Sequence, residues 1–443
     1  MNSQLAILGG PPAINRTLSP YKSMDQDEIK AVADVMQSGR ISEFIGAWCD
    51  EFYGGPLIQE FEKLWCKEFK CKHAISVNSN TSGLIAAMGA IGLSPGEEVI
   101  VPPWSMSATA MAPLFYGGIP VFADVEKDYF CLDLESVKNK IGPKTKAIIA
   151  VNLFGHPAEL KKLRQLADNK GIYLIEDNAQ APHAHEDGNL TGTIGHIGVA
   201  SLNYHKHIHT GEGGMCTTND DDLAQRLQLI RNHGENVTTD LQIDDITNLI
   251  GYNFRLTEIA AAIGICQLKK AQSLIDRRVI LANNLTDRLQ GLDGLIVPKV
   301  RGGCKHVYYE WTAKLDTEFV DIDRNIIAKA LEAEGCPTST GYVDPLYNLP
   351  TFQKKIAIGN QGFPFTLSDI NYNSASCSGD KTPCPSCSCG LSCPNVEELY
   401  EKSSIEFFLC SYQLDGNDIN LVADCYEKVF SNLDLLRSKS QIL

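Results

Sequence analysis

Residues 201–214 read Ser-Leu-Asn-Tyr-His-Lys-His-Ile-His-Thr-Gly-Glu-Gly-Gly, and Lys206 stands near the middle of this stretch. An apolar segment, residues 197–202, precedes the lysine, and a Gly-Glu-Gly-Gly turn follows it. A lysine held in such a loop can act as an amine nucleophile toward an aldehyde cofactor, because that reaction needs a partly deprotonated amine in a fixed position. A solvated lysine in a glycine-rich turn explains the same residues, so the stretch alone leaves both interpretations open.

The composition is that of a globular protein with room for two domains. The chain has 443 residues, of which 44% are hydrophobic and 21% charged. A net charge of −15 argues against nucleic acid or an anionic membrane as a general partner. The first residues lack a signal-peptide pattern, and the 15 cysteines are mostly scattered through apolar segments, so we expect reduced thiols and a cytoplasmic enzyme without a membrane span.

Short apolar strands alternate with helical segments through the first 220 residues or so. This alternation predicts an α/β fold with a mainly parallel central sheet flanked by helices. The expected strands are residues 74–77, 98–101, 120–125, 147–151, 173–176, 199–203 and 215–218, and the expected helices are residues 82–92, 107–116, 134–141 and 158–170.

Three of these strands end in polar residues. Asn78-Ser79-Asn80-Thr81-Ser82-Gly83 follows the first strand and offers backbone N–H groups and hydroxyls to a phosphate, although an ordinary helix cap has the same composition. Asp177 ends a later strand, where a carboxylate can keep a pyridine nitrogen protonated or simply cap a helix. The third strand, expected over residues 199–203, contains Ser201 and is followed by Lys206. The order of phosphate turn, acid and lysine on one parallel sheet is what a pyridoxal phosphate (PLP) site of the aspartate aminotransferase fold requires.

The chain resembles the DegT/DnrJ/StrS family of PLP-dependent sugar aminotransferases through most of its length. The joint order of short motifs carries this resemblance more than any one of them. The motifs are Gly55-Pro56 to Phe61-Glu62, Asn80-Thr81-Ser82, Pro95-Gly96-Glu97-Glu98-Val99-Ile100-Val101-Pro102, Leu153-Phe154-Gly155-His156-Pro157, Glu176-Asp177-Asn178-Ala179-Gln180, Gly211-Glu212-Gly213-Gly214, Asn232-His233-Gly234 and Gly251-Tyr252-Asn253-Phe254-Arg255-Leu256.

The resemblance implies a role for individual residues. Lys206 matches the family's Schiff-base lysine, Asp177 the partner of the pyridine nitrogen, and Gln180 the residue near the ring oxygen of the cofactor. Thr81, Ser82 and Ser201 match phosphate contacts. Asn253 matches an asparagine that reaches the phosphate from the neighbouring subunit, which implies a homodimer with shared active sites.

Two features depart from the family pattern. Met106 stands where relatives commonly stack an aromatic ring on the cofactor, with Trp104 two residues earlier, so the stacking residue stays open. His205, His207 and His209 surround Lys206, but no carboxylate or cysteine signature accompanies them, and we expect no metal there.

The expected domains are an N-terminal arm (1–25), a large PLP-binding domain with a long linking helix (26–292) and a smaller C-terminal α/β domain (293–443), whose final helix is expected over residues 418–436. Residues 342–347 resemble a loop near the substrate. A cysteine-rich insertion, residues 371–394, interrupts the small domain. Two alternatives stay open for it, a zinc site or an unliganded loop, and its cysteines are Cys377, Cys384, Cys387, Cys389 and Cys393.

The resemblance implies an aminotransferase that moves an amino group from L-glutamate or glutamine to a keto-sugar, in nucleotide-linked form, through a Schiff base on Lys206. Such an enzyme serves amino-sugar and polysaccharide biosynthesis. Two alternatives remain at this point. One is a PLP-dependent deoxysugar dehydratase, which would form product without consuming an amino donor. The other is a non-catalytic regulator that keeps the fold.

Overall fold

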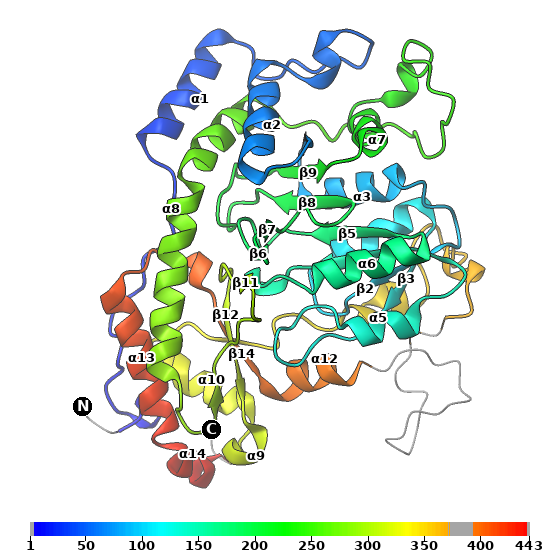
Figure 1. Ribbon diagram of the computed structural model, residues 1–443. Helices are drawn as coiled ribbons and strands as arrows, with labels where there is room; N and C mark the ends of the chain where they lie inside the picture. The colour runs from blue at the N-terminus through cyan, green and yellow to red at the C-terminus, as the bar shows by residue number, and fades with distance from the viewer. Residues whose placement is uncertain (1–3, 371, 373–392, 441–443) are drawn as a thin grey trace.

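A seven-stranded sheet forms the centre of the larger half of the molecule (Figure 1). The structure is a computed structural model that describes residues 4–370, 372 and 393–440. The strands of this sheet are β1 (His73–Val77), β2 (Glu98–Val101), β3 (Ile119–Phe122), β4 (Thr145–Val151), β5 (Tyr173–Asp177), β8 (Ile197–Ser201) and β9 (Gly214–Thr218). Their order across the sheet is β1-β9-β8-β5-β4-β2-β3.

All strand pairs of this sheet are parallel except the two that β9 makes with β1 and β8. The predicted α/β class and the mainly parallel sheet are therefore confirmed. Because β9 returns directly beside β8, the segment between them is a loop at the carboxyl end of β8. That loop contains Lys206. Asp177 ends β5, the next strand of the sheet.

Helices cover the sheet and extend beyond it. They are α1 (Gln26–Ser38), α2 (Pro56–Phe69), α3 (Asn80–Ala90), α4 (Ala108–Met111), α5 (Leu134–Lys140), α6 (Leu160–Lys170), α7 (Asp221–Arg231) and α8 (Glu258–Leu289). Helix α3 is buried along almost its whole length, which explains its uniformly apolar sequence. Helix α8 packs against α1 and α2 at one end and α13 (Gly416–Phe430) at the other, and so joins the two halves (Figure 1).

The smaller half is built on an antiparallel sheet of four strands in the order β10 (Leu295–Ile296), β12 (Trp311–Leu315), β14 (Ser404–Phe407) and β13 (Ser339–Thr340). Its helices are α9 (Thr317–Val320), α10 (Arg324–Ala333), α13 and α14 (Leu433–Lys439). Helices α11 (Pro350–Gln353) and α12 (Pro394–Glu398) belong to the same part of the sequence but pack on the core of the large half through Phe352 and Val396. The N-terminal segment packs on this half, since Leu5, Ile14 and Leu18 join its hydrophobic core.

Three details differ from the sequence predictions. The expected helix over residues 107–116 is the short α4 followed by a 3-10 turn (Ala112–Tyr116), because Pro113 cannot donate a helical hydrogen bond. The expected final helix, residues 418–436, is divided between α13 and α14. A small sheet in the order β11 (Cys304–Lys305), β6 (His185–Glu186), β7 (Asn189–Leu190) was not predicted, because two-residue strands leave no periodic pattern.

The choice between a zinc site and an unliganded loop in the cysteine-rich insertion lies largely outside the described residues, because Cys377, Cys384, Cys387 and Cys389 fall in the part that the structure does not describe. Cys393 is described and is a buried free thiol. Within residues 4–370, 372 and 393–440, no group of three or more metal-binding side chains is present. Among the helices described, none is both long enough and apolar enough to cross a membrane.

Helices α2 and α8 approach closely at Gly264. A Cβ placed on this residue would lie 2.5 Å from Cζ of Phe61, an atom that is part of the buried core. An added methyl group there must push the two helices apart or displace the phenyl ring. The close contact therefore requires the absence of a side chain at position 264.

We expect Gly264→Ala to lower the free energy of unfolding by about 1–3 kcal/mol through overpacking, although alanine favours a helix over glycine by about 1 kcal/mol. Urea denaturation measures this change. Gly416→Ala is the control, since Gly416 begins α13 and a Cβ there has no atom within 4 Å. Equal stabilities for the two variants would show that the α2–α8 contact tolerates a side chain.

Candidate functional site

The loop that contains Lys206 is closed by backbone pairing on both sides. Ser201 pairs with Gly214 at the end of the β8–β9 ladder. Beyond this pair, the Leu202 N–H donates to the Gly213 carbonyl (2.9 Å), and the Thr210 N–H donates to the Leu202 carbonyl (2.9 Å). Backbone hydrogen bonds therefore hold the two ends of the loop together. Within the loop, Lys206 is only 8% exposed.

A cavity of about 240 Å³ opens at the carboxyl ends of the parallel strands, where ligands bind in such sheets. The structure brings six of the eight site residues predicted from sequence into its lining: Thr81, Met106, Asp177, Gln180, Ser201 and Lys206. The other two, Ser82 and Asn253, are not part of the lining.

The Lys206 amine lies against an aromatic ring, with its Nζ 4.3 Å from the centroid of Tyr309. It forms no ion pair with a carboxylate in the part of the chain that the structure describes. Burial lowers the pKa of this amine from its ordinary value, and the nearby acidic groups of Cys410, Asp177 and Glu310 oppose that effect to the extent that they are ionised. A lowered pKa increases the share of the neutral amine, which is the nucleophilic form.

Asp177 is held by hydrogen bonds at the bottom of the cavity, where it is 3% exposed. The Thr109 hydroxyl donates to its Oδ2 (2.9 Å), while the side chain of Asn80 and the Ala179 N–H donate to its Oδ1 (3.3 Å each). Burial raises the pKa of Asp177, and the Thr109 hydrogen bond and the Lys206 charge act against this rise. A cation beside the carboxylate would therefore be strongly favoured.

The polar turn after β1 faces the cavity with the N-terminus of α3. Ser79 caps the helix, since its Oγ accepts from the Ser82 N–H (3.0 Å), and the first N–H groups of a helix lack partners within it. Gly214 packs directly on this turn, because a Cβ there would lie 2.7 Å from the Ser79 carbonyl carbon. The Ser82 hydroxyl donates to Asn78 Oδ1 (2.6 Å), so it stabilises the turn itself.

Two residues that the sequence left open for ring stacking have different surroundings. Met106 lines the cavity and is 63% exposed. Trp104 is fully buried, and its Nε1–H donates to the carbonyls of Gly341 and Val343 (3.0 Å each). Of the two, only Met106 is in contact with the cavity.

Gln180 is fixed from two sides. Its Oε1 accepts from the Phe154 N–H (2.6 Å), and its Nε2 donates to the Tyr342 hydroxyl (2.8 Å). Tyr342 begins the loop over residues 342–347 that was expected near the substrate, and it lines the cavity. Tyr347 instead packs in the core of the large half.

Sequence analysis missed several residues of the cavity. They include Asn80, Asn203, His205, Glu212 and Tyr309. Asn80 and His205 adjoin the predicted residues Thr81 and Lys206, and Asn203 and Glu212 lie in the same 201–214 stretch as Lys206, so proximity in sequence could have identified these four. Tyr309 comes from the smaller half of the chain, and its aromatic neighbours Tyr308 and Trp311 give it the appearance of a core residue. Burial lowers the pKa of His205 to about 4, with help from the Lys206 charge.

Two buried carboxyl groups, those of Glu310 and Glu406, lie near the residues that line the cavity but are not part of its lining. Glu310 follows Tyr309, is fully buried, and neither of its carboxyl oxygens has a hydrogen-bond partner among the described residues. Glu406 on β14 accepts from the Ser339 hydroxyl (3.0 Å) through one oxygen only. Burial raises the pKa of Glu310 well above its ordinary value, and the mutual repulsion with Glu406 adds to this. The structure therefore favours the protonated form of Glu310.

Comparison with known proteins identifies relatives over most of the chain. The sequence model of the DegT/DnrJ/EryC1/StrS aminotransferase family matches residues 22–370. GDP-perosamine synthase of Vibrio cholerae is 33% identical over 331 residues, which are 75% of this chain and 86% of the synthase. L-glutamine:2-deoxy-scyllo-inosose aminotransferase of Streptomyces kanamyceticus is 31% identical over 382 residues, 81% of this chain and 86% of the relative.

The fold is also found in solved structures. DesI, determined in the presence of its TDP-sugar product, aligns over the full length of both chains with a TM-score of 0.79 and 25% sequence identity. The architecture is that of PLP-dependent transferases of fold type I, as the sequence predicted.

The carboxyl pair behind the cavity predicts an unusual dependence of stability on pH. Burial raises the pKa of Glu406 to about 7. The folded protein therefore binds this proton more tightly than the unfolded chain, and stability is lost as the pH rises from about 4.5 through about 7. From about pH 5 to pH 8, we expect the wild type to lose up to about 3 kcal/mol more unfolding free energy than Glu406→Gln.

Denaturant titrations at several pH values measure the difference. Glu401→Gln is the matched control, since this residue is exposed and close to Glu406 in sequence. Parallel pH profiles for the wild type and Glu406→Gln would contradict the prediction.

Proposed function

The chain belongs to the DegT/DnrJ/EryC1/StrS aminotransferase family, and on that premise we propose that it transfers an amino group from glutamate or glutamine to a nucleotide-linked keto-sugar with PLP as cofactor. The observation that carries the proposal is the presence of Lys206 and Asp177 in one cavity beside the N-terminus of α3. The sugar substrate is supported by the relatives named above, one of which is a GDP-perosamine synthase. Glutamine as donor is supported by the inosose aminotransferase.

The groups lining the cavity fit the chemistry of PLP. Lys206 provides a buried amine of lowered pKa, Asp177 a buried carboxylate that feels the Lys206 charge, and α3 a helix N-terminus for a phosphate. Gly214, which lacks a side chain, leaves room for the backbone to approach the turn at Ser79. When bound, the protonated pyridine ring of the cofactor withdraws electrons from the carbon that loses its proton.

The residues of the chain then have distinct tasks. Asp177 holds the proton of the pyridine nitrogen, because a buried carboxylate is stabilised by an adjacent cation. Thr109 and Asn80 keep that carboxylate in place. Lys206 attaches the cofactor at rest and moves a proton at its Nζ during transfer, since its buried amine alternates between neutral and charged forms. Thr81 and Ser201 are the side chains proposed to contact the phosphate, with Ser82 stabilising their turn.

The two alternative functions are not favoured. A dehydratase of related fold forms product without consuming an amino donor, whereas the relatives that support the proposal are aminotransferases. A non-catalytic regulator has no need for a desolvated lysine opposite a buried carboxylate. Both side chains are costly to bury, which is typical of an active site.

We propose that the enzyme is a homodimer in which each subunit completes the other's site. Asn253 is exposed and lies outside the cavity of its own chain. Its backbone carbonyl accepts a weak hydrogen bond from the Asn78 side chain (3.5 Å), which places it next to the polar turn. This position leaves the amide of Asn253 available to a second subunit.

The cytoplasm is the proposed location. The cysteines that the structure describes are free thiols, including the partly exposed Cys49 and Cys304. Proteins of oxidising compartments usually pair such residues, so the free thiols support a reducing environment.

Replacing Lys206 with alanine should lower turnover by at least about 10³-fold, because no other group can attach the cofactor. Borohydride reduction after addition of PLP, followed by peptide mass spectrometry, should find the pyridoxyl group on the Lys206 peptide of the wild type. Lys402→Ala, at an exposed lysine, is the control. Labelling elsewhere, or undiminished turnover by Lys206→Ala, would refute the assignment.

Mixing two inactive variants tests the shared site. If Asn253 acts across the interface, a heterodimer of Lys206→Ala and Asn253→Ala contains one intact site and one site with both defects. After unfolding and refolding together, the mixture should recover about a quarter of wild-type activity, because half of the dimers are mixed. No recovery would place Asn253 in its own subunit's site, and an Asn253→Ala variant that is active by itself would place Asn253 outside any site.

A further inference from the structure

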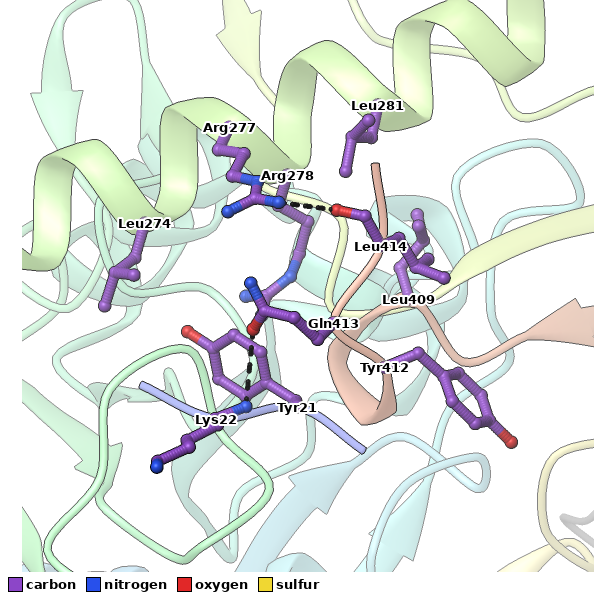
Figure 2. Close-up of a pocket in the computed structure, with 10 residues that line it drawn as sticks. All are labelled: Tyr21, Lys22, Leu274, Arg277, Arg278, Leu281, Leu409, Tyr412, Gln413 and Leu414. Atoms are coloured by element: carbon purple, nitrogen blue, oxygen red, sulfur yellow. Dashed lines mark hydrogen bonds between the residues drawn. The ribbon is translucent and has the colours of Figure 1, made fainter. Parts of the chain in front are cut away.

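A second cavity lies between the N-terminal segment, α8 and residues 409–414 (Figure 2). Its volume is about 50 Å³, which is more than a single water molecule requires and much less than a nucleotide-sugar fills. Lys22 comes from the N-terminal segment, Arg277 and Arg278 from one turn of α8, and Gln413 from the opposite side. The cavity is separate from the one that contains Lys206.

The charges around this cavity are unbalanced. Three cations line it, Lys22, Arg277 and Arg278, and no aspartate or glutamate does. Within the described residues, none of the three cations forms an ion pair with a carboxylate. This is unusual in a chain whose net charge is −15, because acidic side chains are in excess. The cavity therefore concentrates positive charge without a counter-charge from the described protein.

The unpaired positive charge of Arg278 is costly in free energy, because this residue is only 5% exposed. Buried guanidinium groups are normally paired, since removing the charge from water costs several kcal/mol. Here the guanidinium carbon lies 5.0 Å from the centroid of the Tyr21 ring, and Nη1 contacts Nδ1 of the neutral His207. A ring face and a neutral imidazole compensate a buried charge only in part.

The other contacts shape the cavity without neutralising it. Arg277 donates through Nη2 to the Leu414 carbonyl (2.8 Å), as a dashed line in Figure 2 marks. In the orientation of the Gln413 amide that satisfies both its atoms, its oxygen accepts from Arg277 Nη1 (3.2 Å) and its nitrogen donates to the Lys22 carbonyl (3.3 Å). The guanidinium groups of Arg277 and Arg278 thus stand on the α8 side of this small space, while the side chain of Lys22 extends away from them in Figure 2. Arginine presents its donors in a planar fork that fits the oxygens of phosphate or carboxylate.

We propose that this cavity binds a small phosphate-class oxyanion. Three positive charges favour a doubly charged tetrahedral anion over a singly charged carboxylate, and the volume limits the bound group to about the size of a phosphate. Such an anion would join the N-terminal segment to α8 and residues 409–414. It would also fix Arg278 against His207, whose Nε2 faces the Gln180 carbonyl (3.2 Å) beside the first cavity.

The experiment uses the PLP-loaded enzyme, so that the cofactor's own phosphate occupies the first cavity. Inorganic phosphate is titrated at constant ionic strength, with chloride as the balancing anion, and both calorimetry and the midpoint of thermal unfolding are recorded. We expect saturable binding of one phosphate per chain and a rise in the unfolding midpoint. A response equal to that of chloride alone, or no binding, would overturn the proposal.

The matched variants separate this cavity from other anion sites. The double variant Lys22→Gln, Arg277→Gln removes two exposed charges and should bind phosphate about tenfold or more weakly, while keeping its cofactor absorbance. Lys354→Gln, another exposed lysine, should bind as the wild type does. Unchanged affinity in the double variant would also overturn the proposal.

Glycerol phosphate distinguishes two sources of the anion. Binding of inorganic phosphate alone would identify a free ion as the ligand, whereas equal binding of the ester would identify the terminal phosphate of a larger molecule. Neither result depends on the aminotransferase activity, so failure of the proposed reaction and failure of the anion site can be told apart.

Discussion

The pairing of Ser201 with Gly214 is the contact on which the arrangement of the site depends. It returns the chain beside β8 immediately after the lysine loop, so that Lys206 is held over the carboxyl end of the sheet. The same residue, Gly214, packs on the backbone of Ser79 with no room for a side chain. One glycine therefore brings the lysine loop and the start of α3 together, although 134 or so residues separate them in sequence.

Much of this site could be predicted from the sequence because parallel strands gather their carboxyl ends at one edge. Thr81, Asp177 and Lys206 each follow an apolar strand, and the sheet places them in one cavity. Tyr309 and Tyr342 could not be predicted in the same way, because they belong to the smaller half of the chain and reach the cavity through tertiary packing. Composition distinguishes neither of them from an ordinary core tyrosine.

The buried ionisable side chains of the site lower the stability of the fold. Lys206, Asp177 and Glu310 are each nine-tenths buried or more, and Glu310 has no hydrogen-bond partner in the described part of the chain. A protein selected for stability alone would place apolar side chains at such positions. The sequence departs from that rule around the cavity where we propose that a proton is held or moved, and functional sites are the usual location of such conflicts.

Helix α8 explains how both halves support one cavity. Near its start, Gly264 allows close contact with α2, and Gln267 accepts from the Ser23 hydroxyl (2.9 Å) of the N-terminal segment. About three turns later, Arg278 contacts His207 of the lysine loop, and further on Asn283 accepts from the Tyr308 hydroxyl (3.1 Å). Because Tyr308 precedes Tyr309, a single rigid helix sets the distance between Lys206 and the ring that covers it. A change in how Arg278 is held therefore acts on the lysine loop and on the smaller half at the same time.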